Sequence, residues 1–174
     1  MADGSGSRVV RMARTAAPDR PMSVLGLGVI ALVLAADQAT KAIAERRLPL
    51  EDPAQVLPML SLNRVHNTGI AFSMLSSFGS LGLIVLTLVI TVVVFSFWQR
   101  AEDGGRLAAV GYALIIGGAL GNLIDRLAHS YVVDFLMLHI GERVLFVFNL
   151  ADVALTMGPI FLILAYLVPA KRTT

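Results

Sequence analysis

Two aspartates interrupt apolar stretches of a chain that is otherwise poor in charge. Asp134 lies in YVVDFLML, and Asp152 lies near the start of FNLADVALTMGPIFLILAYLV, residues 148–168. A carboxylate inside a membrane helix costs about 2.5 to 3.5 kcal/mol, so its presence indicates a partner or a function. Two close carboxylates in a low dielectric cannot both ionise, so one keeps a proton while the other can act as a base on water. The pair is therefore suited to hydrolysis without a covalent intermediate.

Other interpretations of these acids stay open. Asp152 alone could be an N-terminal helix acid favoured by the helix dipole, worth about 0.3 to 1 kcal/mol. Asp134 interrupts an apolar strand and has no Lys or Arg near it in sequence, so that explanation does not extend to it. Both could form a protonation relay in a small proton-coupled transporter, although transporter sites usually lie near the membrane midplane. A helix-packing scaffold without catalysis would leave Asp134 unexplained.

Three asparagines also stand beside apolar segments: Asn67, Asn122 and Asn149. Each side chain can donate and accept, so each fits either a polar site or hydrogen bonding between helices, which is worth about 0.6 kcal/mol on average. The segment GGALG, 117–121, has a G-x-x-x-G spacing that predicts close helix packing.

The remaining polar residues have structural interpretations. Asp37 and Lys41 have helical i, i+4 spacing, and the adjacent Asp125 and Arg126 are expected to form a structural pair at the membrane interface. The three histidines lack metal-ligand spacing and are interpreted as polar loop residues: His66, His129 and His139. Cysteine, H-E-x-x-H and G-x-S-x-G are absent from the sequence, so thiol, zinc and nucleophilic-serine peptidases are disfavoured and no metal or cofactor is expected.

The elements that must position these residues are membrane helices. The chain is 56% hydrophobic and 15% charged, with a mean hydropathy of +0.77. Runs near the roughly 20 residues needed to cross a bilayer predict four spans, at about 22–42, 80–98, 107–126 and 148–168. Arginines precede the first run, as they would in a cleaved signal peptide, but its helical pattern continues through Ala44 and favours a retained span.

The two longer connections between spans are predicted to contain β structure. Between the first two spans, prolines and short β-like runs end in an Asn-Thr-Gly turn signal. The segment around Gly141 predicts a hairpin that places Asp134 roughly opposite Phe148, one helical turn before Asp152. That register would bring the acids together, although a one-residue slip would turn either side chain to the other face.

The predicted fold is an integral membrane, mainly α protein of four transmembrane helices with a small extracytoplasmic β-containing region. Residues 1–21 form a flexible cytoplasmic tail, 22–170 the membrane domain and 171–174 the cytoplasmic C-terminus. The positive-inside rule favours this orientation, because the tails and the 99–106 loop carry eight basic residues: Arg8, Arg11, Arg14, Arg20, Arg100, Arg106, Lys171 and Arg172. The sequence has no cluster of basic residues interleaved with aromatic residues, so nucleic-acid binding is not expected. The protein is expected to be a monomer.

Five motifs, in order, closely resemble bacterial lipoprotein signal peptidase, the type II signal peptidase: DQATK at 37–41, NRVHNTGIAFS at 63–73, GGALGNLIDR at 117–126, VVDF at 132–135 and FNLADV at 148–153. The resemblance runs from about residue 24 to 168. It implies an inner-membrane aspartyl endopeptidase that cuts prolipoproteins before a diacylglyceryl-modified cysteine, with membrane lipids around it.

The same resemblance implies that Asp134 and Asp152 are the catalytic pair. It implies substrate-binding or site-supporting roles for the other matched positions: Asp37, Lys41, Asn67, Gly69, Ala71, Gly118, Asn122, Asp125, Arg126, Asn149 and Ala151. Two departures are an N-terminal tail longer than the pattern suggests and Ile70, which is bulkier than the small residue usual at that position.

Overall fold

The computed structural model describes residues 24–69, 79–101 and 104–167. Its helices are α1 (Val24–Arg47), α2 (Gly79–Arg100), α3 (Gly105–His129) and α4 (Leu150–Leu167), and its strands are β1 (Ala54–Leu57), β2 (Leu60–Asn67), β3 (Val132–Ile140) and β4 (Arg143–Phe148). All four helices are long and apolar enough to cross a membrane. The predicted class of four membrane helices with a small sheet is therefore confirmed. Ala71, Ile70 and the two predicted tails lie outside the described residues.

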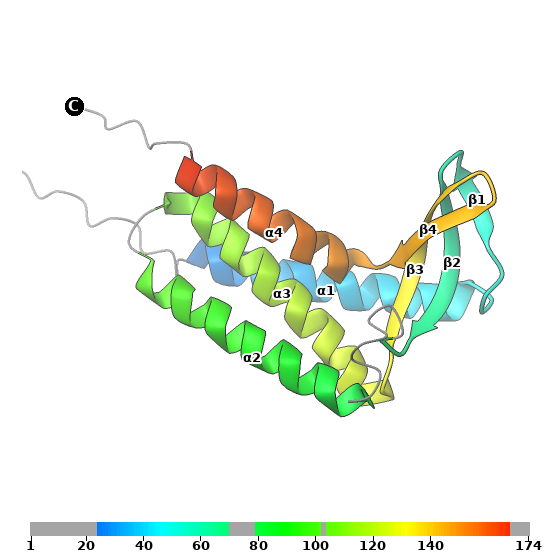
Figure 1. Cartoon of the computed structure of the whole chain (residues 1–174), viewed down its shortest axis with the longest axis horizontal. Coiled ribbons are helices and arrows are strands. Elements are labelled where there is room, and N and C mark those ends of the chain that lie inside the picture. Colours follow the sequence, from blue (N-terminus) through cyan, green and yellow to red (C-terminus); the bar gives the residue numbers. More distant parts are fainter. Residues whose placement is uncertain (1–23, 70–78, 102–103, 168–174) are drawn as a thin grey trace, which may run out of the picture.

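Helix α3 is the centre of the bundle, and it contacts α1, α2 and α4 (Figure 1). Of its most apolar window 67% is buried, against 17% or less for the other three helices. Small residues make this position possible, because they let neighbouring backbones approach without a side chain between them. At the end near the α2–α3 connection, Trp98 of α2 is 1% exposed and stacks on Tyr112 of α3 with ring centroids 6.3 Å apart.

The strands form one antiparallel sheet in the order β1-β2-β3-β4. The predicted hairpin around Gly141 is present, with Gly141 at φ +58° in the turn. The predicted register is wrong by two residues, because Phe148 lies opposite Leu136 rather than opposite Asp134. An irregularity between Leu138 and His139 shifts the ladder. A shift of two residues keeps every side chain on its face, so the acids can still meet.

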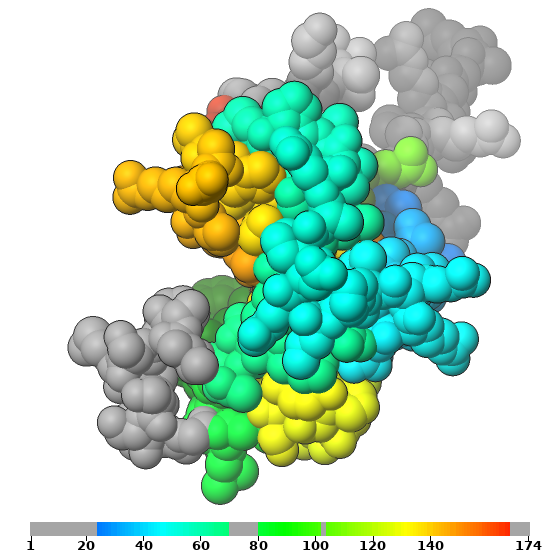
Figure 2. Space-filling view, turned by 90° about the vertical axis from the view of Figure 1, so that its right-hand side faces the viewer, coloured from blue at the N-terminus to red at the C-terminus, as the bar shows by residue number. Residues whose placement is uncertain are grey.

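The sheet continues past one end of the helix bundle (Figure 1). Seen from that end, the two hairpins lie at the front of the molecule beside the ends of α1 and α3 (Figure 2). Helix α3 ends at His129, because Ser130 adopts a left-handed conformation and donates its N–H to the Arg126 carbonyl. Strand β3 begins two residues later, and β4 leads almost directly into α4. This path places Asp134 and Asp152 at the junction of bundle and sheet.

Candidate active site

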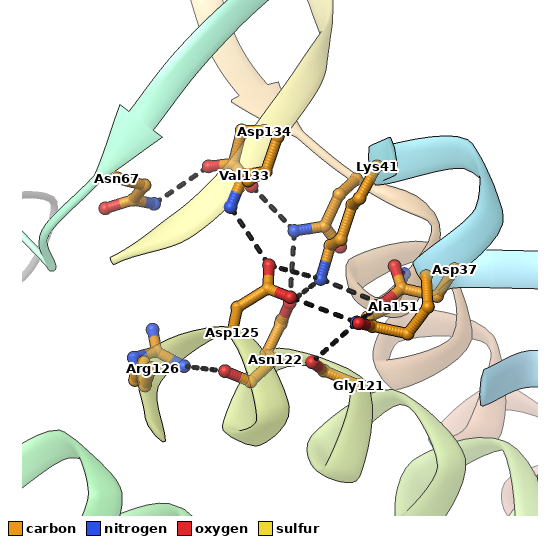
Figure 3. A network of polar contacts seen from close by, with 12 residues as sticks. Asp37, Lys41, Asn67, Gly121, Asn122, Asp125, Arg126, Val133, Asp134 and Ala151 are labelled. Carbon is orange, nitrogen blue, oxygen red and sulfur yellow. Dashed lines mark hydrogen bonds and ion pairs between the residues drawn. The ribbon is translucent and has the colours of Figure 1, made fainter. Parts of the chain in front are cut away.

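Asp134 is held by amide donors on both of its carboxyl oxygens. It lies near the start of β3 and is 2% exposed. Asn67 Nδ2 donates to Oδ2 at 2.9 Å (Figure 3), and Asn149 Nδ2 donates to Oδ1 at 2.6 Å. Two donors from different elements fix the plane of the carboxyl group.

Burial also changes the acidity of Asp134. It raises the pKa of this carboxyl from 3.8 to about 6, and the negative charge of Asp152 raises the pKa as well. The hydrogen bonds from Asn67 and Asn149 and the charge of Lys41 lower the pKa and offset part of this increase. Burial is the largest cause, because desolvation disfavours the charged form. Asp134 is thus a carboxyl group that can hold a proton about two pH units above an ordinary aspartic acid.

Asp152 lies in the first turn of α4 and forms a reciprocal cap with Asn149. Its Oδ2 accepts the Asn149 backbone N–H at 3.1 Å, and Asn149 Oδ1 accepts the Asp152 backbone N–H at 3.0 Å. This is the geometry of a capping box, so the interpretation of Asp152 as a helix-terminal acid is structurally correct. Its other oxygen, Oδ1, accepts from Asn122 Nδ2 at 2.8 Å. Asp152 therefore links α4 to α3 as well as capping the N-terminus of α4.

One side of Asp152 faces open space. The residue is partly exposed and lines an open pocket of about 430 Å³ between β4 and α4, together with Phe146, Phe148 and Met157. Asp134 is buried, whereas Asp152 can be reached from this pocket. The two acids therefore differ in their access to an incoming molecule.

Asn149 joins the two acids. Its side chain donates to Asp134, and its side-chain oxygen and backbone N–H bond with Asp152. The same Nδ2 also donates to Asn122 Oδ1 at 3.1 Å, and Asn149 is fully buried. The asparagines expected to hydrogen-bond between elements do so, and they place both carboxyl groups around one amide.

Behind the asparagines, Lys41 of α1 is the centre of a buried charge cluster (Figure 3). Its Nζ contacts Asp37 Oδ2 at 2.8 Å, Asp125 Oδ2 at 2.9 Å and Asn122 Oδ1 at 2.9 Å. These contacts use all three donors of an ammonium group. Lys41 is 3% exposed, and the predicted i, i+4 pair with Asp37 is confirmed.

Each of the two aspartates in this cluster accepts a hydrogen bond from a backbone N–H, in both cases that of the residue directly before Asp134 or Asp152. Asp37 Oδ1 accepts the N–H of Ala151 at 2.9 Å, next to Asp152. Asp125 Oδ2 accepts the N–H of Val133 at 3.1 Å, next to Asp134. The cluster around Lys41 thus fixes α4 and β3 at the two positions that set the spacing of the acids.

Small residues of α3 allow this approach. A Cβ atom on Gly118 would lie 2.5 Å from the Ala151 carbonyl oxygen, and one on Gly121 would lie 2.6 Å from Asp37 Oδ2. The predicted packing role of the glycine segment is confirmed. Gly118 and Gly121 matter to the site because larger side chains would separate α4 and α1 from α3.

Asn67 is itself fixed by a tight turn. Its Oδ1 accepts the N–H of Gly69 at 2.8 Å, and Gly69 has φ +92°, which side-chain-bearing residues rarely adopt. A Cβ at Gly69 would also meet Leu83 of α2. The turn leaves the Asn67 amide nitrogen free to face Asp134.

The predicted Asp125–Arg126 pair is wrong. Asp125 points to Lys41, whereas Arg126 Nη1 lies 3.5 Å from the backbone oxygen of Asn122, one turn back on its own helix. Neighbouring helix positions point in different directions, so adjacent opposite charges do not face each other. Arg126 is partly buried beside the site rather than part of the ion cluster.

The interpretation of the histidines as polar loop residues is also wrong. His139 lies in β3, is 7% exposed, contacts Ser61 Oγ at 2.9 Å and donates to the Gly141 carbonyl oxygen from Nδ1 at 2.8 Å. His66 lies in β2, and His129 is the last residue of α3. His66 and His139 are placed in strands by pairing with other strands, which the residues next to them in the sequence do not reveal.

The sequence reasoning also missed Gln38. Its Nε2 donates to Asp125 Oδ1 at 3.0 Å and lies 3.2 Å from Asp37 Oδ2, so it adds a neutral donor to the charge cluster. Its place between Asp37 and Lys41 in the sequence was the available signal. Among the residues that the structure describes, no group of three His, Asp or Glu side chains could hold a metal ion.

Replacing Lys41 with methionine is expected to destabilise the protein by about 3 to 5 kcal/mol, because it leaves Asp37 and Asp125 buried without their cation. Thermal unfolding of the purified protein in one detergent would measure the loss. Arg47→Met is the matched control, since Arg47 is exposed in the last turn of the same helix. Equal unfolding temperatures for the two variants would contradict a stabilising role for the cluster.

Comparisons with known proteins agree with this architecture. The family described as Signal peptidase (SPase) II matches residues 29–168. The lipoprotein signal peptidase of Sinorhizobium fredii is 41% identical over 154 residues, covering 88% of this chain and 92% of the relative, and that of Brucella ovis is 45% identical over 139 residues, covering 79% and 86%. A solved bacterial membrane enzyme at 1.9 Å resolution superposes with a TM-score of 0.75 and 28% identity, covering 89% of this chain and 99% of that one.

The match covers all four helices from within α1 onward, both hairpins and both acids. The relatives are matched over most of their own length as well. The resemblance seen in the five motifs is thereby confirmed, and this multi-pass membrane protein belongs to the signal peptidase II family.

Proposed function

We propose that this chain is an aspartic endopeptidase that removes signal peptides from prolipoproteins by cutting before a diacylglyceryl-modified cysteine. Its family is one of signal peptidases, and its relatives are lipoprotein signal peptidases. The aspartic mechanism rests on one observation above all. Asp134 and Asp152, from β3 and α4, are joined through a single buried asparagine, Asn149.

The environments of the two acids suggest different roles. Asp152 borders the open pocket and acts as the base that takes a proton from water. Asp134 is buried with a raised pKa, so it holds a proton and polarises the oxygen of the scissile carbonyl. Water oxygen bonds to the carbonyl carbon, and the tetrahedral species then breaks its C–N bond as a proton passes to the leaving amine. The carboxyl pair ends the cycle with the proton number it began with.

The location of the acids favours a peptidase over a proton relay. Asp152 is in the first turn of α4 and Asp134 is in the sheet, so both lie at one end of the bundle. A lipid-anchored substrate would present its scissile bond at a fixed depth near such an end. We further propose that the sheet end is extracytoplasmic, that both chain termini are cytoplasmic and that the enzyme acts as a monomer in the bacterial inner membrane.

The direct test is cleavage of a synthetic lipobox peptide with a diacylglyceryl cysteine by the purified protein. The expected product begins at the modified cysteine, which mass spectrometry identifies. EDTA and serine-directed reagents should leave the rate unchanged, because the proposed chemistry needs only the two carboxyl groups. Loss of activity in EDTA that zinc restores would point to a metal enzyme instead.

The pH dependence of kcat/KM should show two limbs that belong to the coupled pair. Asp134 must stay protonated in the proposed mechanism, so activity should fall on the alkaline side with a midpoint near the pKa of about 6 that burial gives this carboxyl in the free enzyme. A profile that rises continuously from pH 5 to pH 9 would show that no protonated carboxyl is needed.

A further inference from the structure

Three aromatic rings stack on the sheet side of the site. Tyr131, in the connection from α3 to β3, stacks on His66 of β2 with ring centroids 4.0 Å apart and an interplanar angle of 16°. His129, at the end of α3, lies on Tyr131 with centroids 5.5 Å apart. The close pair, His66 with Tyr131, connects β2 to the segment that leads into β3.

His66 directly precedes Asn67, the donor to Asp134. Val65 pairs with Asp134, His66 with Val133 and Asn67 with Val132. Successive side chains of a strand point to opposite faces, so Asn67 shares a face with Asp134 and is its diagonal neighbour. The His66 ring lies on the opposite face, directly behind this contact.

The end of β2 has limited support from the ladder alone. The pairing of β2 with β1 involves Leu60, Ser61 and Leu62, and the pairing with β3 is irregular between Leu62 and Val65. Beyond that irregularity, Val65 to Asn67 are paired with β3. The ring contact behind His66 is therefore an added restraint at the point where Asn67 must meet Asp134.

The His66 ring acts by stacking rather than by hydrogen bonding. Its Nε2 is buried without a hydrogen-bond partner among the described residues and lies 3.9 Å from Glu45 Oε1. The strand is also tied to α1 through Arg64, whose Nη1 donates to the Glu45 carbonyl oxygen at 2.7 Å. An aromatic ring without nitrogens should thus fill the role of His66.

We propose that the stacked pair of His66 and Tyr131 is a positioning element of the active site, which holds the end of β2 so that Asn67 keeps its hydrogen bond to Asp134. The inference rests on the proposed catalytic role of Asp134. His66 and Tyr131 are positioning residues, because neither contacts the carboxyl pair. Asn67 orients the carboxyl group and favours its ionised form, since it donates to an oxygen.

The test compares kcat, KM and the alkaline midpoint for His66→Ala, His66→Phe, Asn67→Ala and the double variant His66→Ala/Asn67→Ala. His66→Ala should lower kcat about tenfold with little change in KM. Both His66→Ala and Asn67→Ala should raise the alkaline midpoint by about one pH unit, because a hydrogen bond to the Asp134 carboxylate is lost. His66→Phe should restore both values. The double variant should resemble Asn67→Ala alone, because the two residues act through one contact.

The charged groups that face Asp134 stay in place in every variant, so the pH shift reports the Asn67 contact. They are Asp152 of α4, Lys41 of α1, and Asp125 and Arg126 of α3. His129→Ala is the matched control, since His129 stacks on the same tyrosine without belonging to β2, and its kinetics should match the unchanged protein.

Additive effects in the double variant, or an unchanged pH midpoint in His66→Ala, would overturn the proposal. Tyr131→Leu provides a second route to the same loss of stacking if His66→Ala does not fold, and it should shift the midpoint in the same direction. Failure of the proposed catalytic role of Asp134 can be distinguished from failure of this inference. If Asp134 has no such role, Asp134→Asn would still cleave the substrate, whatever the results for the His66 variants.

Discussion

Asp134→Asn and Asp152→Asn are each expected to lower the cleavage rate by about 10³-fold or more, because either change removes the acid or the base on which the proposed catalysis depends. Asparagine keeps the size and planar shape of the side chain but cannot take a proton from water or donate one as an acid. The measurement is the rate of product formation from a lipidated lipobox peptide in one detergent. Robust turnover by either purified variant would remove that residue from the mechanism.

Folding must be measured beside activity, because both acids also hold the structure together. Asp152 caps α4 and bonds to Asn122, and Asp134 accepts from Asn67 and Asn149. The asparagine variants should therefore unfold at somewhat lower temperature than the unchanged protein while remaining folded at the assay temperature. Asp52→Asn is the matched control, since Asp52 is an exposed carboxylate before β1 and its loss should leave the rate unchanged.

A precursor with an unmodified cysteine is expected to remain essentially uncut where the diacylglyceryl form is processed completely. Acyl chains contribute about 0.8 kcal/mol per buried CH₂ to membrane partitioning, so removing them should lower the local substrate concentration by orders of magnitude. The loss should be larger still because an anchored peptide reaches the site at a fixed depth and with little translational entropy left to lose.

The two precursors should be compared in one nanodisc preparation, with the same peptide sequence and the same enzyme. Asp134→Asn gives the background rate for each substrate. Equal rates for the lipidated and unmodified forms would show that the peptide sequence alone is recognised. The position of Asp152 beside the open pocket between β4 and α4 is consistent with a substrate that enters from the membrane.

The dual role of Asp152 explains why its structural interpretation and its proposed catalytic role do not exclude each other. One carboxyl oxygen caps the N-terminus of α4 by accepting the Asn149 backbone N–H, and the other accepts a hydrogen bond from Asn122 of α3. The cap fixes the carboxyl group on a rigid helix terminus. A group held in this way is preorganised for acid and base chemistry, because its orientation is set before a substrate arrives.

The sequence by itself determined the membrane helices, the hairpin around Gly141 and the polar residues that are candidates for the site. Apolar runs about as long as a bilayer is thick favour membrane spans, and β-branched and aromatic runs around Gly141 favour a hairpin. The spacing of Asp37 and Lys41 predicted their ion pair, and glycine spacing predicted the close packing of α3. These are local properties of the chain, which depend on residue type and separation.

Only the tertiary structure decided which polar group meets which. Lys41 pairs with Asp125, 84 positions away, rather than leaving Asp125 to its neighbour Arg126. The register of β3 on β4 depends on an irregularity at Leu138 that no turn signal specifies. Asp37 and Asp125 each bind the backbone N–H before an acid of the pair. Desolvation selects these partners, because a buried charge is stable only beside a complementary group. The fold decides which group lies there, and the separation of two residues in the sequence does not predict it.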